Sequence, residues 1–153
     1  MDLDRFTQAK YSPRTEDVSV PDLAEYFADG EEAVWTVKGL TAIEVAQTKQ
    51  AYDRTETARA LIGALANAPD KIEAVTSALG LTGSDVPQDV SRRIESLMLG
   101  SVSPKIDANS RDAVVKLAET FPVIFYELTN KVDALTGQGQ EPGKPKPSGK
   151  TGA

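Results

Sequence analysis

The order of apolar and polar positions predicts three kinds of segment: a polar start, a short alternating stretch and a series of amphipathic helices. Residues 1–16 are mostly polar and include Tyr11-Ser12-Pro13, so we predict an extended N-terminal arm. The apolar positions that follow have the spacing of secondary structure as far as Gly137. We therefore expect one folded domain over residues 17–137.

A small β element is predicted near residues 17–38. Residues 34–37 (VWTV) alternate as a half-buried strand does, and a turn sequence at residues 28–31 precedes them. We expect a hairpin that pairs residues 18–20 with 34–38. A two-stranded hairpin alone is marginal in water, so Trp35, the only tryptophan, should anchor it on the helices.

Three helices are predicted between residues 41 and 100. Thr41 and Glu44 have the spacing of a capping box, which begins a helix that we expect to reach about residue 67. A second helix should occupy residues 70–80. A third should open near Pro87 and end at Gly100, with this buried stripe: Val90, Ile94, Leu97 and Met98.

The longest amphipathic pattern lies near the C-terminus. One helical face carries Val114, Leu117, Phe121, Ile124, Phe125, Leu128, Val132 and Leu135. Pro122 interrupts this pattern, and proline removes a helical hydrogen bond and clashes with the preceding turn. We predict two helices, or one kinked helix, that break at Phe121-Pro122, with Gly137 as the C-terminal cap.

These elements predict a mainly α fold: a small helical domain with a short N-terminal β element and a disordered C-terminal tail. Residues 138–153 contain no large apolar residue and cannot contribute to a core. Three lysines and one glutamate give this tail a charge of +2, whereas residues 1–137 carry −8. The tail therefore has the opposite charge to the rest of the chain.

The composition argues against catalysis. The 153 residues include no cysteine and no histidine, so the chain lacks a thiolate nucleophile, the commonest general base and the commonest transition-metal ligand. The acidic residues 29–32 lack the ligand pattern of a calcium-binding loop, and we interpret them as a solvated turn. We expect no enzyme activity, no cofactor and no metal.

Charge and hydropathy restrict the partners and the location. Seventeen basic residues against 23 acidic ones argue against a nucleic-acid groove. No apolar run approaches the roughly 20 residues that span a bilayer, and the first residues lack a signal-peptide pattern. We expect a cytosolic protein that binds other proteins.

Candidate partner-binding residues follow from their positions on the predicted helices. Tyr52 and Tyr126 lie off the buried stripes, and exposed aromatic residues are common anchors in interfaces. Phe121 and Pro122 mark the helix break, where a groove would form. Arg92 is a candidate for contact with an acidic partner surface. A solvated helix flank with a local ion pair, either Asp89 with Arg93 or Arg92 with Glu95, is the preferred interpretation.

Three stretches resemble tail assembly chaperones of long-tailed, siphovirus-like bacteriophages. They are residues 34–41 (VWTVKGLT), 92–102 (RRIESLMLGSV) and 119–139, of which the last is the most specific. The resemblance implies a non-virion protein of the host cytoplasm. It would bind the tape-measure protein, help to recruit tail-tube subunits and be missing from mature virions.

The resemblance also implies a longer second product, because this family often uses a ribosomal frameshift near the end of the first reading frame. Pro142-Gly143-Lys144 and Ser148-Gly149-Lys150 can each be encoded with the slippery heptamer G GGA AAG. Two other classes stay open: a structural tail or neck protein of the virion, and a small regulatory adaptor that binds a host protein. The strong apolar stripe also leaves self-association open.

Overall fold

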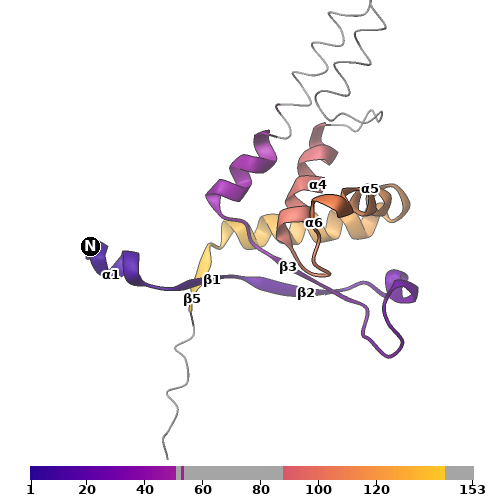
Figure 1. Ribbon diagram of the computed structural model, residues 1–153, viewed down its shortest axis with the longest axis horizontal. Coiled ribbons are helices and arrows are strands. Elements are labelled where there is room, and N and C mark those ends of the chain that lie inside the picture. Colours follow the sequence, from indigo (N-terminus) through magenta and orange to yellow (C-terminus); the bar gives the residue numbers. More distant parts are fainter. Residues whose placement is uncertain (51–52, 54–87, 144–153) are drawn as a thin grey trace, which may run out of the picture.

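The computed structural model describes residues 1–50, 53 and 88–143 (Figure 1). An antiparallel sheet has the strand order β2-β3-β4, formed by β2 (Thr15–Ser19), β3 (Val34–Lys38) and β4 (Ser101–Ser103). Val18 lies opposite Trp35 in this sheet. The predicted hairpin is therefore confirmed, with β2 beginning earlier than expected.

A second small sheet joins the two ends of the described chain. In it, β1 (Tyr11–Pro13) pairs antiparallel with β5 (Gln140–Pro142). Strand β5 lies in the range for which composition predicted a disordered tail. The N-terminal range likewise differs from an extended arm, because residues Leu3–Gln8 form helix α1.

The prediction of a mainly α fold was wrong. Among the described residues, 59% are helical and 18% lie in strands, in two sheets, so the domain is mixed α/β. Strands β1, β4 and β5 are three residues long. Strands of three residues are too short to show a clear alternation of apolar and polar positions in the sequence. They form because partner strands far along the chain supply their hydrogen bonds.

Three helices complete the described domain: α4 (Gln88–Gly100), α5 (Arg111–Thr120) and α6 (Pro122–Gly137). The predicted break at Phe121-Pro122 is confirmed, and Pro122 occupies the first turn of α6, where its missing N–H costs nothing. Gly137, the predicted C-terminal cap, is the last helical residue of α6. The glycine with a left-handed backbone conformation, which often ends a helix, is Gly139, two residues later.

The core lies between the β2-β3-β4 sheet and helices α4, α5 and α6 (Figure 1). Its fully buried large side chains include Val37, Ile94, Leu97, Phe125, Leu128 and Val132. All members of the predicted C-terminal stripe are buried, apart from the half-buried Phe121. Trp35 is buried as expected, and its indole Nε1 donates to Ser101 Oγ at 2.9 Å. The tryptophan thus links β3 to β4.

The predicted capping box is present at the start of the helical residues 42–50. The backbone N–H of Thr41 donates to Glu44 Oε2 at 2.8 Å, and the N–H of Glu44 donates to Thr41 Oγ1 at 3.2 Å. Lys38 Nζ lies 2.8 Å from Glu44 Oε1. Burial alone would raise the pKa of Glu44, but the hydrogen bonds from Lys38 and Thr41 outweigh burial and lower it.

Several predictions concern residues outside the described ranges. These are the helix as far as residue 67 beyond its first turns, the helix at residues 70–80, Tyr52, and the tail beyond residue 143. In the ranges that are described, no helix is long and apolar enough to cross a membrane.

Candidate protein-binding face

The outward side of α6 carries a shallow depression open to solvent, which we call the α6 outer face. It is formed by Pro122, Val123, Tyr126, Glu127, Asn130, Lys131 and Ala134. The opposite side of the same helix faces the core. Because an α-helix turns once in 3.6 residues, positions 123, 126, 127, 130 and 134 share a side when positions 124, 128, 132 and 135 share the other.

Tyr126 lies near the middle of the α6 outer face and is 40% exposed. Its ring meets the ring of Phe125 edge to face, with centroids 5.7 Å apart. The guanidinium of Arg93 lies 4.7 Å from the centroid of the Tyr126 ring. Tyr126 is thus an aromatic side chain held by its neighbours in one orientation, which lowers the entropic cost of contact with a partner.

Arg93 positions this part of the face from α4. Its Nε donates to Asp89 at 3.1 Å, and its Nη1 donates to Thr129 Oγ1 and to Asn130 Oδ1, each at 2.9 Å. The predicted pair of Arg93 with Asp89 is confirmed, whereas the contacts of Arg93 with α6 have no signal in the sequence spacing. A planar guanidinium can make such contacts in several directions at once.

Val123 is a further candidate for partner binding, which the sequence pattern did not single out. It is 78% exposed, three positions before Tyr126 on the same side of the helix. Its signal was present in the sequence: Val123 lies in the second half of the C-terminal pattern but off the buried stripe. An apolar residue off the stripe, in register with an aromatic residue, indicates a second apolar face.

The other predicted site residues divide into two groups. Pro122 is exposed on the α6 outer face, and Phe121 packs against the core at the preceding helix junction. Arg92 does not line that face. Its Nη2 lies 3.8 Å from carboxylate oxygens of both Asp89 and Asp133.

Of the two alternative local pairs, Asp89 with Arg93 is formed and Arg92 with Glu95 is not. Glu95 instead pairs with Arg111, which comes from α5. The pairing joins two helices that pack against each other, α4 and α5. A tertiary contact of this kind competes with the local i, i+3 pair, and the sequence spacing alone does not reveal it.

The α6 outer face combines apolar and polar side chains, a composition that protein-binding surfaces share. Valine, proline and alanine provide apolar area, tyrosine provides a rigid amphipathic ring, and Glu127, Asn130 and Lys131 provide polar contacts around them. In the described part of the chain, no group of three or more histidine, cysteine or acidic residues is placed to hold a metal ion. The acidic turn at residues 29–32 is exposed, and Glu31 accepts a hydrogen bond from the backbone N–H of Ala28 there.

Comparison with known proteins adds no relative. No family model, no curated protein and no solved structure matches this chain.

Proposed function

We propose that this protein is a tail assembly chaperone of a long-tailed bacteriophage and that it binds the tape-measure protein through the α6 outer face. The observation that carries the proposal is the exposure of Val123 and Tyr126 on a helix whose other side belongs to the core. An exposed aromatic and aliphatic pair of this kind is typical of a protein-binding surface.

The proposed client suits this surface. The resemblance implies a long, helical, aggregation-prone tape-measure protein. An amphipathic helix buries its apolar stripe in a shallow groove through anchors spaced three or four residues apart. Val123 and Tyr126 have that spacing, and Asn130 and Ala134 continue the row at intervals of four. Two helices packed side by side would therefore bring matching rows of side chains together.

The proposal includes the setting of this activity. The chaperone would act in the cytoplasm of the host bacterium, help to recruit tail-tube subunits around the tape-measure protein, and be released before the virion matures. The net charge of −6 supports solubility of a chain that exposes apolar side chains. A frameshifted longer product would extend from the C-terminal tail.

A pull-down with the tape-measure protein encoded by the same genome tests the proposed binding face. Tyr126→Ala and Val123→Ser should each weaken capture about 5- to 30-fold, because truncating an interface anchor commonly costs about 1–2 kcal/mol. Tyr26→Ala is the matched control, because Tyr26 is also exposed but belongs to the short helix η1 (Pro21–Tyr26) and does not line the α6 outer face. The control should bind as the wild type does.

Two results would contradict the proposal. Unchanged capture by Tyr126→Ala, Val123→Ser and Tyr52→Ala would show that the client, if it binds, uses another surface. Detection of the chain in purified mature virions, in stoichiometric amounts, would instead support a structural tail or neck protein. Mass spectrometry of purified particles makes this second measurement.

A further inference from the structure

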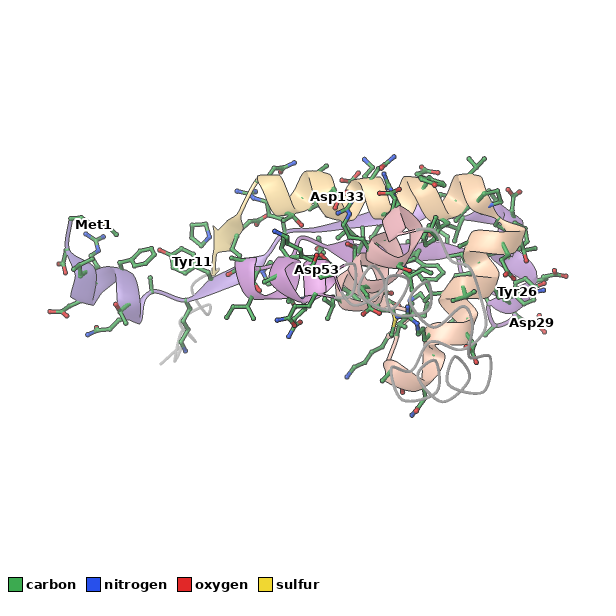
Figure 2. The ribbon with its side chains drawn as sticks, turned by 90° about the horizontal axis from the view of Figure 1, so that it is seen from above. Met1, Tyr11, Tyr26, Asp29, Asp53 and Asp133 are labelled. Atoms are coloured by element: carbon green, nitrogen blue, oxygen red, sulfur yellow. The ribbon has the colours of Figure 1, made fainter. Side chains whose placement is uncertain are left out.

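The N-terminal arm presents a second set of exposed apolar side chains. We call residues 1–10 the α1 arm; it contains helix α1 and no buried residue. Met1 is 94% exposed, Leu3 66% and Phe6 53%. Figure 2 shows the arm projecting beyond Tyr11, clear of the rest of the domain.

Helix α1 is too short to be stable on its own. It has six residues, whereas isolated helices shorter than about 12–15 residues are marginal in water. Local contacts support it: Asp2 accepts a hydrogen bond from the N–H of Arg5, and the rings of Phe6 and Tyr11 lie 5.9 Å apart. In spite of these contacts, the side chains of Met1 and Leu3 stay mostly exposed to solvent. The arm therefore has the character of a segment that binds a surface outside its own domain.

The arm cannot reach the α6 outer face of its own chain near Val123. Strand β1 is paired with β5, which follows the C-terminal end of α6, and the N–H of Gly143 donates to Lys10 O at 2.8 Å. Val123 lies 14 residues earlier than Gly137, or about 21 Å along the helix at 1.5 Å per residue. In Figure 2, Met1 points away from the domain at the Tyr11 end, and Tyr26 lies at the opposite end.

We propose that the α1 arm of one copy docks on the α6 outer face of a second copy. Leu3 and Phe6 are three residues apart on α1, the same spacing as Val123 and Tyr126 on α6, so the two helices can pack in register. One charge pair can also form beside the contact: Arg5, on one flank of the Leu3/Phe6 row, can face Glu127, on one flank of the Val123/Tyr126 row.

The contact joins different surfaces of the two copies, so it is heterologous, and each copy keeps one free arm and one free face. Such contacts propagate into chains or close into rings. One short arm buries less surface than a standard interface of about 1,600 Å². The association is therefore weak and depends on protein concentration.

Sedimentation of the full chain, with no client present, tests the proposal. The wild type should associate as its concentration rises, and the arm variant Leu3→Ser/Phe6→Ser and the face variant Val123→Ser/Tyr126→Ser should each weaken association at least tenfold. A mixture of these two variants should recover dimers and no larger species, because only the face of the first and the arm of the second are intact. Ile43→Ser, an exposed apolar position elsewhere, is the control and should leave association unchanged.

Cysteine crosslinking identifies the contact directly, because the native chain has no cysteine. Oxidation of Phe6→Cys mixed with Val123→Cys should give a disulfide between the two chains, and Phe6→Cys mixed with Ile43→Cys should give at least tenfold less. A wild type that stays monomeric, association equal to wild type in both serine variants, or a disulfide within one Phe6→Cys/Val123→Cys chain would each overturn the inference. None of these readouts uses the tape-measure protein, so they are independent of the proposed function.

Discussion

At the scale of single residues, two adjacent arginines have different roles. Arg93 is the less exposed of the two, and it joins α4 to α6 through Thr129, Asn130 and the ring of Tyr126. Arg92 points to two carboxylates at 3.8 Å, and about a third of its side chain is exposed. Adjacent residues on a helix point about 100° apart, which is why only one of them can face α6.

Arg93→Ala should lower the free energy of unfolding by about 1–3 kcal/mol, because it removes charged hydrogen bonds and a cation–π contact. Arg92→Ala should cost about 0–1 kcal/mol, as exposed ion pairs usually do. Urea denaturation followed by the fluorescence of Trp35, the single and buried tryptophan, measures both values. Equal losses for the two variants would show that the contacts of Arg93 with α6 add nothing to stability.

At the scale of elements, the fold depends on the close approach of β3 and α6. Gly39 follows β3, and a Cβ placed on it would lie 2.7 Å from the carbonyl carbon of Leu135. Leu40 continues the contact, because its N–H donates to Thr136 Oγ1 at 2.8 Å. Glycine at position 39 therefore lets the backbone that follows β3 lie directly against the backbone of α6.

Gly39→Ala should destabilise the protein by about 1–3 kcal/mol, because the added methyl group meets backbone atoms that cannot rotate away. Gly137→Ala is the matched control, since a Cβ there meets nothing within 4 Å and the position ends α6. This control should be neutral or stabilise by up to about 1 kcal/mol. Thermal or urea denaturation of both variants makes the comparison, and a Gly39→Ala protein as stable as the wild type would show that α6 shifts freely.

At the scale of the whole molecule, the domain that contains the hydrophobic core and the α1 arm are separate parts. Within residues 1–50, 53 and 88–143, every buried residue lies between Val18 and Leu135, and the first thirteen residues are exposed. The proposed client and the proposed second copy would share the α6 outer face. If both proposals hold, binding of a client displaces the arm of the neighbouring copy.

Deletion of residues 1–9 should change the free energy of unfolding by less than about 0.5 kcal/mol, because the deleted segment contributes no buried side chain. The deletion keeps Lys10, whose carbonyl accepts from Gly143. The same truncated protein should lose self-association in sedimentation experiments. A loss of stability above about 1 kcal/mol in dilute solution would show that the arm packs on its own domain instead.

Features with strong local causes could be predicted from the sequence alone. The capping box at Thr41 and Glu44, the helix break at Pro122 and the buried stripe of α6 depend on hydrogen bonds and spacing within a few residues. The strand that contains Trp35 could be predicted for the same reason, because its alternation of buried and half-buried residues is a local pattern. The exposure of Tyr126 followed from its position off the stripe.

Only the tertiary structure decided the features that join distant residues. The three-residue strands β1, β4 and β5 exist because a partner strand lies beside them, and this changed the fold class from mainly α to mixed α/β. The contact of Arg93 with α6 and the pairing of Glu95 with Arg111 likewise needed the packing of α4 against its neighbours. Sequence spacing predicts which residues share a face, and packing decides what that face meets.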